Sequence, residues 1–442
     1  MPTVLPVFFA LLQGVAAGLF AALPDVASAE PEYQPNVGPS QSTYTCQTRV
    51  ARDYALGIEE ALDPPVEIDP TLPIQGQGEV FDGVQLVTLR PGLVTPAWQC
   101  TVENGCFDDV GDNPRGTALL WVPDRVKKNA PRVLYVHGGS WYYGSPWTDG
   151  YPTFAAKLAK TLQMPVLVID YTLAPVGDFE TILRQVGEAA NFLARHRPLD
   201  LLKGKLSPSK RPRKSPPLFI LGDSSGGGTA ISALVAQASP EGLPGADGAV
   251  LRGGVAYSPW VNLLSNSPTY LSNLNSVHEP GDYSLGDVAF GLGDVEGIVT
   301  SYQANAQDYM GPGSLTDPVA NPFFAPEKWL KRMPPLSLHV GQPELLLSDN
   351  AILANRIAQS GGRVELHQYD GMWHVFPMYA DGCGSGEPVV LAESAYLATQ
   401  TFLDGLARGK KLRCEQAPCF FGHFEYPQGV DTAAGLSSFR GK

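Results

Sequence analysis

The sequence is poor in positive charge. Its 31 Lys and Arg residues face 44 Asp and Glu residues, so the net charge is −13 and the isoelectric point lies near 5.0. Nucleic acid and anionic membrane surfaces repel such a chain, so neither is predicted as its main partner. Internal repeats and heptads are absent, which excludes solenoids and coiled coils. With 44% hydrophobic and 17% charged residues, the composition is that of a packed enzyme.

Only one long hydrophobic run occurs, and it lies near the N-terminus. It covers residues 4–23 and is followed by the Ala-Ser-Ala of residues 27–29. Such a triplet is typical of a signal-peptidase site, although about 20 apolar residues also suffice to cross a bilayer. No Lys or Arg precedes Arg49, so the usual basic flank is missing. We expect residues 1–29 to be a signal peptide, with an uncleaved signal anchor as the alternative. The body of the protein is then secreted or lumenal, or held at a membrane by this segment.

The six cysteines agree with an oxidising compartment. An even number of cysteines in a secreted chain favours disulfide bonds. The pairs that we expect are Cys100–Cys106, Cys414–Cys419 and Cys46–Cys383. The close pairs do not have C-x-x-C spacing, so a zinc site is the weaker alternative. No metal or organic cofactor is expected.

Short apolar runs alternate with helical patterns from residue 83 onward. The strand-like runs are residues 84–89, 117–122, 132–137, 165–170, 218–222, 251–258, 336–341 and 364–369. Helical patterns cover residues 179–196, 350–359 and 392–407. Apolar runs without alternation suit strands buried on both faces of a mainly parallel sheet. The sequence therefore predicts a doubly wound α/β domain over residues 30–410, with residues 411–442 as a C-terminal tail.

Two segments interrupt this alternation. Residues 30–80 are rich in Pro and acidic residues and have no clear period, so we expect them to fold over another part of the domain. Residues 262–318 are rich in Gly, Asn, Ser and Asp and follow the sixth strand-like run. A connection of that length inside a compact domain is usually a lid or a binding element.

A G-x-S-x-G pentapeptide, residues 222–226, lies between a strand-like run and a helix-like stretch. This context is the one that a nucleophile elbow requires, because the glycines allow the sharp turn that projects a serine from the sheet. Ser224 has Gly at both −2 and +2, whereas Ser225 has Asp223 at −2. Ser224 is therefore the predicted nucleophile. The missing G-K-S/T ending excludes a phosphate-binding loop.

A second glycine-rich turn begins at His137, where an earlier strand-like run ends. Its glycines leave backbone N–H groups free to face an oxygen that becomes negative. We expect the N–H groups of Gly139, Ser140 and Ser225 to form an oxyanion hole, with Gly138 shaping the loop. The alternative is an ordinary Gly turn after a strand.

A histidine and an acid complete the predicted site. His374 follows a strand-like run by a short turn and comes after Ser224 in the chain, so it is the predicted general base. Glu344 lies three residues beyond the run 336–341 and is expected to hold the imidazole. Asp349 is the alternative acid, but a helix N-cap position would explain it without catalysis.

Residues 132–379 resemble the hormone-sensitive-lipase type of α/β-hydrolase, which includes family IV esterases, arylacetamide deacetylase and steryl acetyl hydrolases. The motifs that carry the resemblance are His137-Gly138-Gly139, Asp170 to Pro175, residues 222–227, Ser258-Pro259-Trp260, Gly341 to Glu344, and Gly371 to Phe376. The resemblance implies an α/β-hydrolase fold, with a mostly parallel central sheet flanked by helices. It also implies a triad of Ser224, Glu344 and His374, and a cap built from about residues 30–80 and 262–318. The chain departs from the family pattern at Ser140, where a third Gly is usual, and at Glu344, where Asp is commoner.

We therefore expect a serine carboxylic-ester hydrolase that acts on small-molecule esters through an acyl-enzyme. One alternative is an amide or formamide hydrolase, because arylformamidases also contain His-Gly-Gly-x-Trp. Another is a ligand-binding protein on the same scaffold, like the gibberellin receptors, although those lack the catalytic histidine that is present here as His374. Several aromatic residues near the site either line a pocket or pack in the core: Trp141, Tyr142, Tyr143, Trp147, Trp260 and Trp373.

Overall fold

The computed structural model describes residues 72–98, 115–147, 150–206, 216–273, 287, 295–380, 389–409 and 420–425, the last of these by backbone only. The expected signal segment, all six cysteines and most of the expected N-terminal cap segment lie outside these residues. Among the helices in the described ranges, none has both the length and the apolar character needed to span a bilayer.

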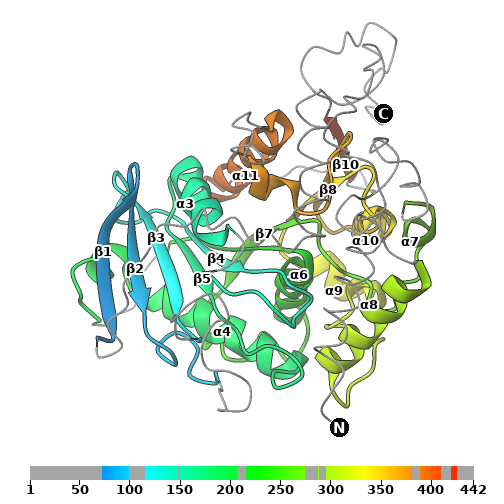
Figure 1. Ribbon diagram of the computed structural model, residues 1–442, viewed down its shortest axis with the longest axis horizontal. Helices are drawn as coiled ribbons and strands as arrows, with labels where there is room; N and C mark the ends of the chain where they lie inside the picture. The colour runs from blue at the N-terminus through cyan, green and yellow to red at the C-terminus, as the bar shows by residue number, and fades with distance from the viewer. Residues whose placement is uncertain are drawn as a thin grey trace, which may run out of the picture.

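A ten-stranded sheet runs through the centre of the described chain (Figure 1). Its strands are β1 (Ile74–Phe81), β2 (Val84–Leu89), β3 (Ala118–Pro123), β4 (Arg132–Val136), β5 (Val166–Ile169), β6 (Leu218–Asp223), β7 (Leu251–Tyr257), β8 (Leu336–Gly341), β9 (Val364–Tyr369) and β10 (Phe420–Glu425). They stand in the order β1-β2-β3-β5-β4-β6-β7-β8-β9-β10. Pairing is antiparallel from β1 to β5 and parallel from β5 to β10, so the predicted, mostly parallel sheet is confirmed.

Helices cover both faces of this sheet (Figure 1). They are α3 (Tyr151–Leu162), α4 (Phe179–Arg195), α5 (Pro198–Leu201), α6 (Ser224–Ala238), α7 (Pro268–Ser272), α8 (Val295–Met310), α9 (Glu327–Arg332), α10 (Leu347–Gln359) and α11 (Val390–Ala407), with short 3-10 turns at Pro322–Phe324 and Phe376–Tyr379. Helices α3 and α11 pack on one face, whereas α4, α6 and α10 pack on the other. Each layer buries its own apolar cluster against the sheet, which is the arrangement expected of a parallel sheet with crossover helices.

The sequence pattern explains how α4 forms. Ile182, Val186, Ala189 and Leu193 lie on one stripe and are all buried, as a period of 3.6 residues requires. The side chain of Asp178 accepts a hydrogen bond from the N–H of Thr181 at 2.9 Å and so caps the first turn.

All eight strand-like runs form strands close to their expected bounds. Two further strands were not expected. β1 lies at the end of the segment expected to form part of a cap, and it pairs with β2 at one edge of the sheet. β10 lies in the segment assigned to a separate tail, and it extends the sheet beyond β9. The sheet therefore extends into the end of the expected cap segment and into the expected C-terminal tail.

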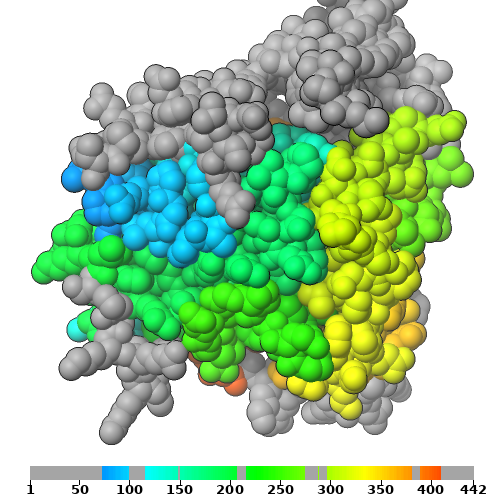
Figure 2. Space-filling model, turned by 90° about the horizontal axis from the view of Figure 1, so that it is seen from below, coloured from blue at the N-terminus to red at the C-terminus, as the bar shows by residue number. Residues whose placement is uncertain are grey.

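The described part of the insertion after β7 packs closely on the α4–α6 side of the sheet. In Figure 2 its yellow-green atoms lie directly against the green atoms of that half of the molecule. Tyr309 of α8 stacks on Trp141, with ring centroids 3.8 Å apart, and Tyr302 of α8 lies 4.4 Å from Trp260. Trp141 and Trp260 are themselves 4.7 Å apart. We call these four rings the aromatic ladder.

Burial distinguishes the two interpretations of the aromatic residues near the site. Trp141, Trp260 and Trp373 are each at most 1% exposed, so they pack in the core. Tyr143 is 45% exposed and lies at the surface.

Candidate active site

Ser224 stands at the junction of β6 and α6. Its φ is 49°, a left-handed conformation that non-glycine residues adopt only when their surroundings impose it. A Cβ on Gly222 would lie 2.5 Å from the carbonyl oxygen of Gly226, and a Cβ on Gly226 would lie 2.2 Å from that of His137. Both glycines of the pentapeptide are therefore required by close backbone packing around the turn.

Replacing Gly226 with Ala is expected to lower the free energy of unfolding by about 3 kcal/mol, because the new methyl group meets backbone that has no room to move. Gly405→Ala in α11 is the matched control, since a Cβ there meets nothing within 4 Å. Ala is the better helix former, so the control should raise stability by about 0.5–1 kcal/mol. Urea unfolding of both variants measures the difference, and equal stabilities would contradict the packing account.

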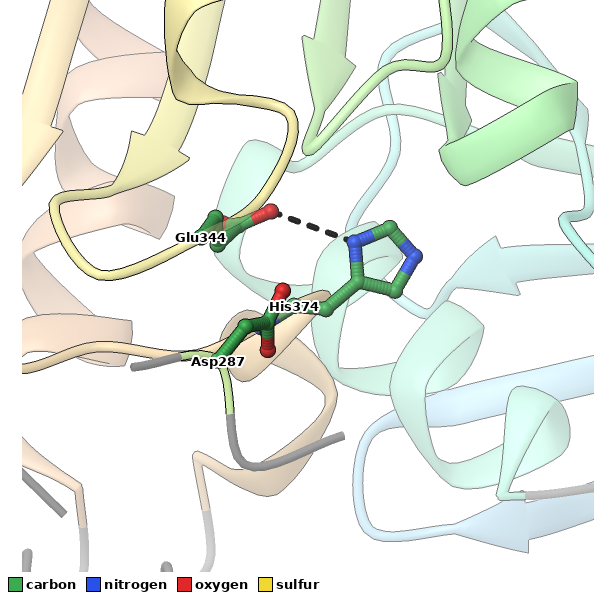
Figure 3. Close-up of side chains that lie close together, drawn as sticks. All are labelled: Asp287, Glu344 and His374. Carbon is green, nitrogen blue, oxygen red and sulfur yellow. Dashed lines mark hydrogen bonds and ion pairs between the residues drawn. The ribbon is translucent and has the colours of Figure 1, made fainter. Parts of the chain in front are cut away.

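The structure brings the three predicted triad residues together. Nε2 of His374 lies 3.0 Å from Oγ of Ser224, and Nδ1 of the same ring lies 3.1 Å from Oε2 of Glu344. Figure 3 shows the bond between the carboxylate and the imidazole. The three side chains thus form one chain of hydrogen bonds, from the hydroxyl through the ring to the acid.

Glu344 is fully buried and held from its other side. Its Oε1 accepts hydrogen bonds from the N–H of Gly341 at 2.6 Å and from the hydroxyl of Ser258 at 2.7 Å. The Ser258 hydroxyl in turn accepts from the N–H of Val375, which directly follows His374. These contacts fix the carboxylate so that its second oxygen faces the imidazole.

Asp349, the alternative acid, lies elsewhere. The expectation that it caps α10 is wrong, because that helix begins at Leu347 and Asp349 belongs to its first turn. Its Oδ1 accepts from the side-chain amide of Asn262 at 3.2 Å. Burial raises the pKa of Asp349 to about 7 against the hydrogen bonds that it accepts. The geometry therefore joins Glu344, and not Asp349, to His374.

The imidazole is tuned by several acids. Burial alone would lower the pKa of His374, but its hydrogen bond to Glu344 and the negative charge of that residue outweigh this effect. Weaker contributions come from the charges of Asp287 and Asp223. The net result is a pKa above the ordinary value, so the ring binds a proton more readily than a free histidine does.

Asp287 was not predicted as a site residue, yet it lies beside the triad (Figure 3). It is fully buried. Its Oδ1 accepts from the N–H of His374 and its Oδ2 from the N–H of Leu345, each at 3.3 Å. Burial and then the charge of Glu344 raise the pKa of Asp287 to about 7. No motif or spacing marked this residue, because it lies in an insertion with several other acids.

One atom each from Asp287, Glu344 and His374 lie within 4.8 Å of one another, as in a metal-binding cluster. Two of these residues already hydrogen-bond each other, and His374 also faces the Ser224 hydroxyl. We therefore assign the group to the triad network.

The loop after β4 meets the elbow from the other side. The N–H of Gly138 donates to Oδ1 of Asp223 at 3.1 Å and to the hydroxyl of Tyr151 at 2.8 Å. This N–H is therefore engaged within the protein, which makes Gly138 a loop-shaping residue and not an oxyanion donor. In the described part of the chain, no acceptor faces the N–H groups of Gly139 and Ser140.

Ser225 and Ser140 are two further residues of the expected oxyanion hole. Ser225 lies in the first turn of α6, where N–H groups have no intrahelical acceptor. Its hydroxyl accepts from the N–H of Trp141 at 3.2 Å and so ties the loop to the elbow. Ser140, which stands where the family usually has Gly, adopts φ 52°, so a serine occupies the left-handed position that glycine favours.

Asp223, the residue before Ser224, joins the elbow to the loop after β4. Its carboxylate accepts from the hydroxyl of Tyr135 at 2.7 Å and from that of Tyr151 at 2.8 Å, in addition to the N–H of Gly138. Burial raises the pKa of Asp223 to about 6, although these hydrogen bonds favour the charged form. The residue next to the nucleophile thus fixes the loop opposite it.

His137 has a structural role. Burial lowers its pKa to about 3, so the ring is neutral at physiological pH. The ring stacks on Tyr171 at 4.3 Å, and its Nδ1 lies 2.7 Å from the carbonyl oxygen of Gly138. The first residue of the His-Gly-Gly motif therefore packs in the core and shapes the loop.

Comparison with known proteins identifies the family of this chain. A family model described as the alpha/beta hydrolase fold matches residues 133–378, more than half of the sequence. The chain belongs to the α/β-hydrolase family. The matched region of this α/β-hydrolase includes Ser224, Glu344 and His374.

Several relatives of this α/β-hydrolase are known. An esterase of Acinetobacter venetianus is 25% identical over 273 residues, which cover 62% of this chain and 76% of that protein. Carboxylesterase NlhH of Mycobacterium tuberculosis is 26% identical over 331 residues, covering 69% and 88%. The solved structure of EstE5 soaked with ethyl alcohol matches with a TM-score of 0.55 at 20% identity, over 84% of this chain and 100% of that one, and so supports the fold. The expected kinship with the hormone-sensitive-lipase group is confirmed.

Proposed function

We propose that this α/β-hydrolase is a serine carboxylic-ester hydrolase that acts on small-molecule esters through Ser224, His374 and Glu344. The observation that carries the proposal is the continuous hydrogen-bond chain from the Ser224 hydroxyl to the Glu344 carboxylate. The relatives named esterase and carboxylesterase support the same class of reaction.

The first half of the reaction forms an acyl-enzyme. The Ser224 oxygen attacks the acyl carbon while its proton passes to Nε2 of His374. The carbonyl oxygen becomes negative and accepts hydrogen bonds from the N–H groups of Gly139, Ser140 and Ser225. When this intermediate collapses, the bond to the alcohol oxygen breaks and the imidazolium returns its proton to the leaving alcohol.

The second half reverses these roles. Water gives a proton to Nε2 of His374 and attacks the acyl carbon, and the acid leaves as the Ser224 oxygen regains the proton. Glu344 orients the imidazole through Nδ1 and stabilises the imidazolium in both halves. The chain of three groups therefore needs no oxidant, reductant or second substrate besides water.

Hydrolysis and covalent labelling together test the proposal. The purified full chain is expected to hydrolyse p-nitrophenyl acetate and to react with a fluorophosphonate at Ser224, identified by peptide mass spectrometry. Labelling at Ser224 without turnover of any ester in a panel of acyl lengths and alcohols would contradict the assignment to esters. An unlabelled Ser224 would contradict the triad itself and favour a binding protein.

The amide-hydrolase alternative is tested with paired substrates. An acetate ester and an N-formyl aniline present a similar aromatic leaving group on oxygen and on nitrogen. We expect the ester to have the higher kcat/KM. A higher value for the formanilide would assign the chain to formamide hydrolysis by the same triad.

A further inference from the structure

We propose that Asp287, contributed by the insertion after β7, is a positioning residue that fixes the backbone of the catalytic histidine and tunes the basicity of its ring. This inference rests on the proposed function, since it assigns Asp287 a part in the same proton transfer. Asp287 is 57 residues before Glu344 and 63 after Ser224 in the chain, so only the folded structure relates it to the triad.

The contacts of Asp287 join the two loops that carry the base and the acid. One oxygen accepts from the N–H of His374, and the other accepts from the N–H of Leu345, which directly follows Glu344. A single carboxylate thus spans the gap between the loop after β9 and the loop after β8. Because catalysis depends on the distance between base and acid, this tie adds to the hydrogen bonds through Ser258 that also join the two loops.

The charge of Asp287 also bears on the triad. Its carboxylate and that of Glu344 lie on the same side of the His374 ring (Figure 3), with atoms within 4.8 Å of one another. Asp223 at the end of β6 adds a third, weaker negative contribution to the ring. An opposite charge at such distances stabilises the protonated imidazole, the state formed when Ser224 gives up its proton.

Holding two backbone N–H groups does not by itself require a charged side chain at position 287. Two backbone N–H groups can be satisfied by neutral acceptors, and burying a second carboxylate beside Glu344 is costly. The cost is visible in the pKa of Asp287, which burial and the neighbouring charge raise to about 7. The positive charge of the protonated His374 ring opposes this rise and favours the ionised carboxylate.

The test compares pH profiles of Asp287→Asn and the wild-type full chain. The rate of labelling by a fluorophosphonate and kcat/KM for p-nitrophenyl acetate are measured from pH 5 to 9. Removing the charge lowers the pKa of His374, so the ring stays neutral at lower pH and the acidic limb should move down by about one pH unit. Loosening the tie should also lower kcat on the plateau by about tenfold, with little change in KM.

Two further variants separate the causes. Glu296→Gln removes an exposed carboxylate from α8 of the same insertion. This variant should leave the acidic limb of the pH profile and the plateau value of kcat unchanged. Asp287→Glu keeps the charge but displaces the oxygens, so it should lower the plateau while the limb stays within about 0.3 pH units. If Asp287→Asn fails to fold, Asp287→Glu decides alone, and a wild-type plateau in that variant overturns the proposal.

The outcomes distinguish this inference from the proposed function. If the wild type is labelled and turns over ester but a folded Asp287→Asn variant keeps both limb and plateau, the role of Asp287 is wrong and the triad stands. If the wild type shows neither labelling nor turnover, the proposed function is wrong, and the role assigned to Asp287 is wrong as well.

Discussion

Replacing Ser224 with Ala is expected to lower kcat/KM for p-nitrophenyl acetate by at least about 10⁴-fold. The variant keeps the imidazole and the oxyanion donors but has no oxygen that can form the acyl-enzyme. A methyl group also fits the left-handed turn as well as the serine side chain does, so the fold should persist. Steady-state hydrolysis and circular dichroism measure the two quantities.

Ser232→Ala is the matched control for this prediction. Ser232 lies on the same helix and is buried, and its hydroxyl donates a long bond of 3.4 Å to the carbonyl of Ala320. Its removal should leave turnover within about twofold, because a weak hydrogen bond away from the reacting atoms contributes little. Full activity in Ser224→Ala would mean that another residue is the nucleophile.

Replacing Glu344 with Gln is expected to lower kcat by about 10³–10⁴-fold. The carboxylate has one oxygen committed to the N–H of Gly341 and the hydroxyl of Ser258, so an amide would place its NH₂ against Nδ1 of His374. The ring would then carry its proton on Nε2, the nitrogen that must accept from Ser224. The loss should persist at high pH, because the tautomer is wrong at every pH.

Asp349→Asn tests the alternative acid under the same conditions. The side chain is buried beside Asn262, away from the imidazole, so an amide of equal size should keep kcat within about threefold. A loss of thermal stability is compatible with the assignment, since the buried network changes. A folded Asp349→Asn variant without activity, together with an active Glu344→Gln variant, would exchange the two roles.

The sequence predicted the triad well because its determinants are local. Gly222 and Gly226 mark the elbow around Ser224. Any larger residue would clash there, because its Cβ would lie less than 2.6 Å from a backbone oxygen. Glu344 and His374 each follow a strand of the parallel sheet by a short turn, so the sheet brings both to the same edge. Strands buried on both faces leave continuous apolar runs that are easily recognised.

The contacts that the sequence did not reveal depend on long-range packing. Asp287 lies among other acidic and polar residues, and only the folded chain singles it out. The N–H of Gly138 was expected to shape the loop, but its partners, Asp223 and Tyr151, are distant in sequence and could not be named from it. Asp349 was misplaced because α10 begins on the apolar residue Leu347, without a capping side chain.

The two edge strands were missed for a different reason. β1 has the sequence IQGQGEVF, in which two glycines and several polar residues hide the strand pattern. It forms by pairing with β2, with shifts of register near its glycines. Edge strands need less apolar burial than central ones, so composition marks them weakly.

The aromatic ladder has a consequence for engineering. Tyr309 and Tyr302 of α8 stack on Trp141 and Trp260, and Trp141 directly follows the loop residue Ser140. The insertion and the loop after β4 thus share one packed set of rings. A chimaera whose insertion lacks Tyr302 and Tyr309 would lose the rings that pack on Trp260 and Trp141, so α8 and the two tryptophans have to be exchanged together.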